Sequence, residues 1–299
     1  MAGLFVTVGQ NGQRLFSENG MDWKGSQTGK EGESYRVVAF GNGSFVAAGS
    51  YGGNKNIFAV TSDGEKWETA QSEAKNQKTI RGLGFHAGTF YGIGGDPGSV
   101  GASKPFVSTS VDGLSWSEAR DIGGKHMIRR LAFGNGLIVG VGDRGRRVAS
   151  SDGQVWKDAP DVKAIDTLVD VAFGGVSDTS RTGGGRFVGV GLNSLRMTSE
   201  DGLTWTHRQV GEEGEHLNSI LWAGDRFVAI GIGVTYFSPD GVTWQRQPNQ
   251  DAPFGVAFGN GAFVGTNWKG RILHSTDAVA WQQVYKCANH VDSVAFGTP

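Results

Sequence analysis

The chain of 299 residues carries 28 Lys and Arg against 29 Asp and Glu and has no Lys- and Arg-rich run, so nucleic acid is not an expected partner. No apolar stretch approaches the roughly 18 residues of a membrane-spanning helix, and the single cysteine, Cys287, excludes an internal disulfide framework. Glycine occurs 50 times, but 38% of the residues are hydrophobic, so we expect many short strands and tight turns rather than disorder.

The first predicted strand begins almost at once, because Met1-Ala2-Gly3 leads directly into the apolar run 4–9. No signal peptide is therefore expected. Two locations stay possible, the cytoplasm or export with a leader removed. The run 4–9 resembles the second strand of the repeat described next, and no first strand precedes it in the sequence.

One repeat of about forty residues then recurs along the chain. A first strand ends in Ala-Phe (37–40), a Gly-Asn-Gly turn follows (41–43), and a second strand ends in Gly (45–49). After a variable loop and a third strand, a Ser/Thr-x-Asp-Gly-x-x-Trp segment, here called the Asp turn, reverses the chain into a fourth strand. Asn-Gly between two strands is a strong hairpin signal, and four antiparallel strands repeated radially form a propeller blade.

The seven Asp turns show how the repeats fill the chain. They end at Trp23, Trp67, Trp116, Trp156, Trp205, Trp244 and Trp281. After the last of them, the run 291–296 resembles a first strand without a second. We therefore predict one domain over 1–299, an all-β, seven-bladed β-propeller of four-stranded antiparallel blades. Its ring would be closed by a blade made of 290–299 plus 1–24, which also removes exposed sheet edges.

The Asp turn resembles the Asp box of bacterial neuraminidase repeat (BNR) proteins, in a variant with one residue fewer between Asp and Gly. Asn19 replaces Asp in one copy and Ala278 replaces Gly in another. That family includes sialidases, other glycan-active propellers and relatives that resemble photosystem II assembly factors. The resemblance implies that the turns are structural and lie on the face opposite the ligand site. Calcium binding by their aspartates is not favoured, because each copy offers one carboxylate whereas calcium takes six to eight oxygens.

The predicted ligand face is the one where the first strands begin. Four places before each repeat's aromatic residue stand Arg36, Arg81, Arg129, Val169, Asn218, Phe254 and Asp292, and the next position adds Arg130 and Asp170. Arginines in three consecutive blades would converge on a carboxylate, sulfate or phosphate, since each offers a planar pair of donors. Alternatively, they are charges tolerated in a wet channel, with the aspartates as partners. Arginines before the third strands, at positions 14, 144, 146, 147, 196 and 271, are expected to be mostly solvated.

Among the aromatic residues, Trp268 is the best candidate to stack on a sugar ring, with Tyr35, Tyr51 and Tyr285 behind it. The loops that lead into three first strands contain His126, His216 and His290. These strands belong to non-adjacent blades, so the histidines are not expected to share a metal ion, and no cofactor is expected. The two longest insertions, 96–105 and 174–185, are expected on the ligand face and on the opposite face respectively.

Three functions stay open, and the first is preferred. The chain is expected to be a monomeric, ligand-binding propeller that recognises a glycan or another small anionic ligand at the channel mouth. A sialidase-like glycoside hydrolase or lyase is an alternative, but no catalytic residue can be assigned, and Tyr35-Arg36-Val37-Val38 matches only two residues of the sialidase Phe/Tyr-Arg-Ile-Pro motif. The third hypothesis is a non-catalytic scaffold with a protein partner, which an exposed apolar patch would favour.

Overall fold

The computed structural model describes residues 3–52, 55–72, 79–95, 104–160, 162–175 and 184–299. Its 28 strands form seven four-stranded antiparallel sheets, which confirms the predicted all-β fold of seven propeller blades. Within the described residues, the remaining regular elements are two single-turn 3-10 helices, η1 (Asp143–Gly145) and η2 (Trp268–Gly270). None of the described helices has the length and apolar character needed to cross a membrane. Both long insertions lie largely outside the described residues.

The chain forms two compact units, and each is described by itself. The first (Met1–Asp96, Phe106–Asp121 and Pro253–Pro299) holds four blades, in strand order β24-β25-β26-β27, β28-β1-β2-β3, β4-β5-β6-β7 and β8-β9-β10-β11. Its strands are β1 (Leu4–Gly9), β2 (Arg14–Ser17), β3 (Lys24–Gln27), β4 (Glu33–Gly41), β5 (Ser44–Tyr51), β6 (Lys55–Thr61), β7 (Glu68–Ser72), β8 (Ile80–His86), β9 (Thr89–Gly94), β10 (Phe106–Ser110), β11 (Arg120–Asp121), β24 (Gly255–Gly259), β25 (Ala262–Asn267), β26 (Arg271–Ser275), β27 (Gln282–Lys286) and β28 (Val291–Gly297).

The second unit (Pro97–Pro105 and Ile122–Ala252) holds three blades, β12-β13-β14-β15, β16-β17-β18-β19 and β20-β21-β22-β23. Its strands are β12 (Ile128–Gly134), β13 (Leu137–Gly142), β14 (Arg147–Ser150), β15 (Lys157–Asp158), β16 (Leu168–Gly174), β17 (Arg186–Gly191), β18 (Arg196–Ser199), β19 (Thr206–Gln209), β20 (Leu217–Trp222), β21 (Phe227–Gly231), β22 (Val234–Ser238) and β23 (Gln245–Pro248). The prediction of a single domain over 1–299 stays a prediction.

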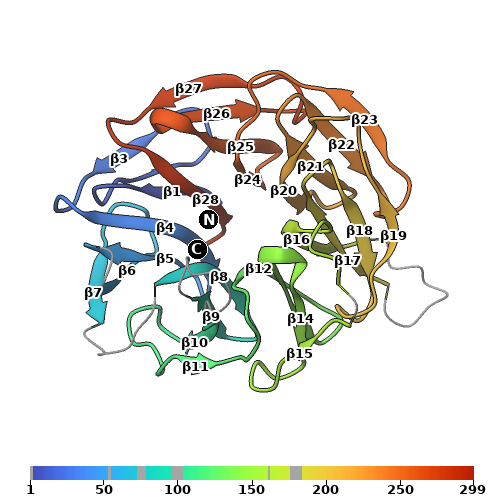
Figure 1. The fold of residues 1–299 in the computed structure, drawn as a ribbon. Helices are drawn as coiled ribbons and strands as arrows, with labels where there is room; N and C mark the ends of the chain where they lie inside the picture. The colour runs from blue at the N-terminus through green and yellow to red at the C-terminus, as the bar shows by residue number, and fades with distance from the viewer. Residues whose placement is uncertain (1–2, 53–54, 73–78, 96–103, 161, 176–183) are drawn as a thin grey trace. The chain divides into compact units, whose positions relative to one another are not determined.

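The predicted blade shared by both ends of the chain is confirmed. β28 pairs antiparallel with β1 from Leu4 opposite Gly297 to Gly9 opposite Val291 (Figure 1). β2 and β3 complete this sheet, and β3 ends at Gln27. Phe5 and Val291, one from each end of the chain, are both buried in the same apolar cluster.

Each Asp turn is held by its own side chains. In the turn that ends at Trp67, the Asp63 carboxylate accepts hydrogen bonds of 2.8 Å from the backbone N–H groups of Glu65 and Lys66. Thr61 Oγ1 accepts one from Gly64, and the Trp67 indole donates to the Gly64 carbonyl at 3.0 Å. Asn19 Oδ1 makes the same two backbone contacts at 2.9 Å, which explains why Asn can replace Asp in that turn.

Neighbouring blades meet where the aromatic ring of one first strand lies on the terminal glycine of another. A Cβ atom on Gly41 would lie 2.1 Å from the Phe85 ring, and one on Gly297 would lie 2.0 Å from Phe40. Equivalent contacts join Gly134 to Phe173, Gly174 to Trp222 and Gly259 to Phe296. Glycine is therefore required at these five positions by the space for a neighbouring ring, and not by its own backbone angles.

The asparagines of the Gly-Asn-Gly turns add polar contacts between blades. Asn42, at φ 49°, donates from its side-chain amide to the carbonyls of Gly88 and Val111 in the next blade, at 3.1 and 3.2 Å. Asn135 and Asn260 make equivalent bonds. Asparagine tolerates the left-handed backbone of the turn and keeps its amide free to reach the neighbouring blade.

The expectation that the arginines before the third strands are mostly solvated is wrong for four of the six. Arg14, Arg146, Arg147 and Arg196 are only 5–7% exposed. The Arg14 guanidinium carbon lies 5.3 Å from the centroid of the Trp67 ring, and that of Arg196 lies 3.9 Å from the centroid of the Tyr236 ring. A flat guanidinium stacks on aromatic faces, so Arg14, Arg147 and Arg196 pack against rings of the next blade instead of lining a rim. Arg146 instead forms an ion pair with Asp158 and donates to the His126 carbonyl.

We expect Gly41→Ala to lower the free energy of unfolding by about 1–3 kcal/mol, because its methyl group would overlap the Phe85 ring. Gly255→Ala is the matched control, since its Cβ would meet only Thr266 Oγ1 at 3.5 Å. Chemical denaturation of both variants would measure the difference. Equal stability of the two variants would contradict the packing role of Gly41.

A second prediction concerns the stability of the protein at low pH. Backbone N–H groups, chiefly that of Lys66, lower the pKa of Asp63, and the pKa values of the aspartates in five other Asp turns are lowered too. Their stabilising contribution is complete above the unfolded pKa of about 4 and is lost as pH falls through the folded pKa. We therefore expect Tm to fall below about pH 4. Asp63→Asn should make this fall in Tm smaller, because Asn keeps the hydrogen bonds of the turn but does not titrate. Asp225→Asn, at an exposed site, is the control and should leave the fall unchanged. Identical profiles of Tm against pH for the wild type and Asp63→Asn would refute the stabilising role of the ionised Asp63.

Candidate ligand-binding site

The positions singled out in the sequence are β-bulges. In β4, Tyr35 pairs with Gly49 and Val37 with Ala48, so Arg36 is an extra, unpaired residue. Register shifts at the same place make bulge residues of Arg81, Arg129, Val169, Asn218 and Asp292. A bulge redirects its side chain and interrupts pairing, and bulges are common beside binding sites.

A glycine at or near the end of the second strand makes room for this bulge in six of the blades. A Cβ atom on Gly49 would lie 1.9 Å from the Ser34 carbonyl oxygen, and one on Gly142 would lie 2.0 Å from that of Met127. Gly9, Gly94, Gly191 and Gly231 meet equivalent carbonyls. In the remaining blade β25 ends in Asn267, and its pairing with β24 has no shift. The glycine and the bulge therefore occur together.

In the second unit, the arginines predicted to bind a ligand already form ion pairs with carboxylates of the chain. Arg129 is ion-paired with Asp143, with Nη2 and Oδ2 at 3.1 Å, and Arg130 Nε lies 3.8 Å from Asp170 Oδ1. Asp170 also accepts hydrogen bonds of 2.9 Å from the backbone N–H groups of Val171 and of Ile220 in the next blade. Burial raises the pKa of Asp170, against the effect of Arg130. Asp170, on β16, therefore connects its own blade to the blades of β12 and β20.

Asn218, the bulge residue of β20, lies in the same unit as that pair. Its side-chain Nδ2 is buried and has no hydrogen-bond partner within the described residues. The convergence of Arg129 with Arg36 and Arg81, which belong to the first unit, stays a prediction.

In the first unit, Asp292 interacts electrostatically with His290 and Arg36. Burial raises the pKa of Asp292, while the charges of His290 and Arg36 oppose the increase. Asp292 Oδ2 and His290 Nδ1 are buried without a hydrogen-bond partner in the part of the chain that the structure describes. Arg36 is exposed, and Arg81 is half-buried on β8 of the same unit. Asp292 and His290 thus offer two polar atoms with unused bonding capacity.

Trp268 belongs to this site. It opens η2, where Asn267 Oδ1 accepts a hydrogen bond of 2.7 Å from the Trp268 backbone N–H. Its side chain is 62% exposed. The ring is stacked on His290 with centroids 5.4 Å apart and meets Phe254 edge-on at 5.1 Å. Phe254 and Trp268 occupy the repeat positions that Arg129 and Asp143 occupy in the blade β12–β15. An aromatic pair in the blade β24–β27 therefore replaces the ion pair of the blade β12–β15.

Tyr35 is placed differently from the other candidates. It is 2% exposed, and the Arg14 guanidinium carbon lies 5.5 Å from its ring centroid. Burial raises the pKa of Tyr35 to about 12. The side chain belongs to the core between two blades, where Arg14 packs on it.

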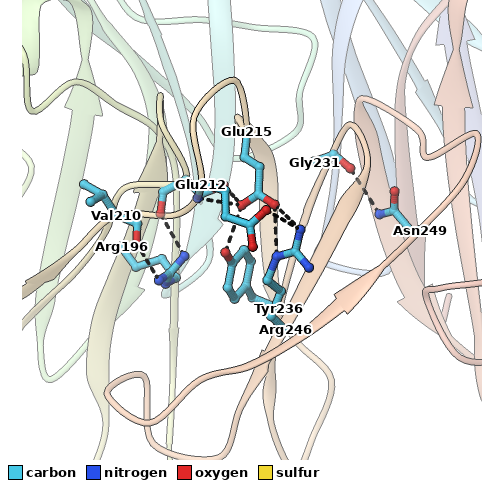
Figure 2. A network of polar contacts seen from close by, with 9 residues as sticks. Arg196, Val210, Glu212, Glu215, Gly231, Tyr236, Arg246 and Asn249 are labelled. Atoms are coloured by element: carbon cyan, nitrogen blue, oxygen red, sulfur yellow. Dashed lines mark hydrogen bonds and ion pairs between the residues drawn. The ribbon is translucent and has the colours of Figure 1, made fainter.

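A polar network in the second unit was not found from the sequence (Figure 2). Glu215 is 8% exposed and accepts hydrogen bonds from the Tyr236 hydroxyl at 2.9 Å and from two nitrogens of Arg246 at 3.0 and 2.6 Å. Burial would raise the pKa of Glu215, but the bonds from Arg246 and Tyr236 outweigh it and leave the pKa lowered. Arg196 donates to the Val210 carbonyl at 3.4 Å. The network fixes the loop that leads into β20 and its bulge.

The Glu215 network has a counterpart one blade earlier. There Asp166, just before β16, accepts a hydrogen bond of 2.9 Å from Arg208 on β19, and its carbonyl accepts one of 2.8 Å from Arg147. An acidic residue three places before the bulge, with an arginine on the fourth strand, is the sequence signal that could have located both pairs.

No protein-family model and no curated protein matches this sequence, so membership of the bacterial neuraminidase repeat family is not established. Solved structures do match. YCF48 bound to D1 peptide is 16% identical with a TM-score of 0.61, over 88% of this chain and 85% of that one. A catalytically inactive virginiamycin B lyase from Staphylococcus aureus with quinupristin is 12% identical with a TM-score of 0.63, over 83% of each chain.

The WD40 β-propeller domain of Doa1 is 10% identical with a TM-score of 0.62, over 87% of this chain and 85% of that one. At these identities the likeness concerns the fold alone. Because it extends over most of the chain, it supports the seven-bladed β-propeller.

Proposed function

We propose that the chain is a glycan-binding propeller whose ligand stacks on Trp268 and contacts Asp292 and Arg36. The exposed Trp268 ring, held by Phe254 and His290 beside a carboxylate oxygen without a hydrogen-bond partner among the described residues, carries this proposal. The C–H face of a sugar packs on an aromatic ring, and its hydroxyl groups both donate and accept hydrogen bonds. Asp292 supplies an acceptor and Arg36 supplies donors, so the site matches a hydroxyl-rich ligand.

The same observations favour sugar hydroxyls over an oxyanion held by several arginines. Arg129 and Arg130 are engaged by Asp143 and Asp170, and a carboxylate stands beside Arg36. An anionic ligand would have to compete with these carboxylates. A neutral saccharide, or an acidic one that directs its charge to Arg36 alone, avoids that competition.

The test compares Trp268→Ala with Ile232→Ala, since both native side chains are 62% exposed and the second lies in the other unit. We expect a glycan array, followed by calorimetry on the best oligosaccharide, to show binding that Trp268→Ala weakens by up to about tenfold, because aromatic stacking contributes about 0.5–1.5 kcal/mol. Ile232→Ala should bind like the wild type. Equal affinity of the Trp268 variant and the wild type would refute the proposal.

Acid should weaken the same binding. The raised pKa of Asp292 means that its carboxylate takes up a proton at a higher pH than an ordinary aspartate. The carboxylate is therefore lost on acidification at a higher pH than an ordinary aspartate would be, and Asp292→Asn should bind weakly with a flatter pH profile. Calorimetry between about pH 4 and 7 measures both effects. A wild-type affinity that does not change over that range would remove Asp292 from the site.

A second candidate function, binding of a peptide segment, is favoured by an apolar surface in the second unit. Leu192, Val210 and Ile232 are 45%, 48% and 62% exposed. Leu192 pairs with His216, next to Leu217, which pairs with Gly231 before Ile232. Arg196 donates a hydrogen bond to the carbonyl of Val210 (Figure 2). The structurally similar YCF48 has been solved with a bound peptide, which is consistent with this candidate.

Selection from a displayed peptide library distinguishes the two candidates. If peptides bind here, the selected sequences should be rich in aliphatic residues. Their binding should be lost in a Leu192→Asp/Ile232→Asp variant and kept in Trp268→Ala, because charged side chains oppose apolar burial. Selected peptides that bind all three proteins equally would exclude this surface.

A further inference from the structure

Two surface recesses occupy the same place in consecutive blades of the second unit. One, of about 440 Å³, lies at the Asp turn of β16–β19 and is lined by Arg186, Thr198, Ser199, Glu200, Asp201, Thr204, Thr206 and His207. The other, of about 350 Å³, lies at the Asp turn of β20–β23 and is lined by Asp225, Arg226, Phe237, Ser238, Pro239, Thr243, Trp244 and Gln245. Both volumes fall in the range of about 300–1,000 Å³ found for ligand pockets.

Two residue types at fixed repeat positions distinguish these blades. Arg186 and Arg226 each stand directly before a buried phenylalanine of the second strand, and Thr204 and Thr243 each stand directly before the tryptophan of the Asp turn. The other five repeats have Leu4, Ser44, Thr89, Leu137 and Ala262 at the first position, and Asp22, Lys66, Ser115, Val155 and Ala280 at the second. Both types therefore occur together in the blades β16–β19 and β20–β23.

The chemistry of the β20–β23 recess matches a sugar. Arg226 Nε lies 3.1 Å from Asp225 Oδ1, and both side chains remain more than half exposed, so donors and an acceptor stand side by side. Adjacent hydroxyl groups of a saccharide need such a combination, because each hydroxyl both donates and accepts. Phe237, with its ring 6.0 Å from the Arg226 guanidinium, and Trp244 supply the apolar surface on which a sugar ring packs.

In the β16–β19 recess, hydrogen bonds hold the His207 side chain in place. His207 has a positive φ of 51°, and its Nδ1 lies 2.8 Å from Thr198 Oγ1 and 3.1 Å from Thr206 Oγ1. A histidine in this backbone conformation is uncommon and persists where its surroundings hold it. Arg186 and Glu200 place a donor and an acceptor in the same recess.

We propose that these two recesses are saccharide subsites at the Asp-turn ends of neighbouring blades, filled by successive units of a neutral oligosaccharide. In these blades the Asp turn and the bulge lie at opposite ends of the strands, so the subsites are separate from any ligand held at the bulges. The inference does not rest on the Trp268 site, because it uses none of its residues. Under this proposal, two similar repeats carry equivalent saccharide subsites.

The experiment records amide chemical shifts of the full chain during titration with three neutral probes, chitotriose, cellotriose and mannotriose. At least one probe should move the amides of Arg226, Thr243 and Gln245 together with those of Thr204 and Thr206. Arg226→Ala and Asp225→Ala should each weaken that probe about tenfold, since each removes a hydrogen bond to a charged group. Lys157→Ala, an exposed cation on β15, is the matched control and should leave the affinity unchanged.

Trp268→Ala separates this inference from the proposed function. Binding at the recesses should survive in that variant, whereas binding at the Trp268 site should not. The inference is overturned if no probe moves the recess amides, or if an Arg186→Ala/Arg226→Ala variant binds with wild-type affinity. Shifts confined to Trp268 and its neighbours would overturn it too, while leaving the proposed function standing.

Discussion

Contact between an aromatic ring and a bare backbone determines how neighbouring blades pack. Because Phe85 lies on Gly41 and Phe40 on Gly297, the first strands approach so closely that no side chain fits between the ring and the main chain. That approach brings the carbonyls of Gly88 and Val111 within reach of the Asn42 amide. A large share of the glycines in the chain is explained by such close approaches and by turns with positive φ. The frequency of glycine is thus partly a packing requirement, which recurs at five contacts between first strands.

The buried arginines bring positive charge into the contacts between neighbouring blades. Arg14, Arg147 and Arg196 stack on rings of the next blade and donate to main-chain carbonyls, so their charge stabilises the scaffold and is not available to a ligand. Variation is permitted instead at the bulges, where the backbone is kept constant by an opposing glycine while the side chain changes from Arg to Val, Asn or Asp. A constant backbone with variable side chains is a suitable arrangement for recognition.

The strands, the Asp turns and the blade shared by the two ends could be predicted, because each depends on short patterns that recur with a constant period. The sequence also located the bulge positions, although it did not show that they are bulges. It could not show that Arg14 and Arg196 are buried, because the rings that cover them come from the next blade. Nor could it show that Asp143 engages Arg129, or that His290 supports Trp268, since both depend on the conformation of loops between strands. Glu215 was missed for the same reason, because its partners lie 21 and 31 residues away.

The pairing of β1 with β28 has a consequence for the order of folding events. Its residue pairs are separated by nearly the whole length of the chain, so forming this sheet closes the longest loop in the protein and carries the greatest entropic cost of any strand pairing. Blades made of consecutive strands need only local contacts and therefore form earlier, whereas the shared sheet is completed late. The same sheet then slows unfolding of the native state. Once β1 and β28 have paired, unfolding from either end must first break a complete antiparallel ladder, so the lifetime of the native state depends on this one pairing.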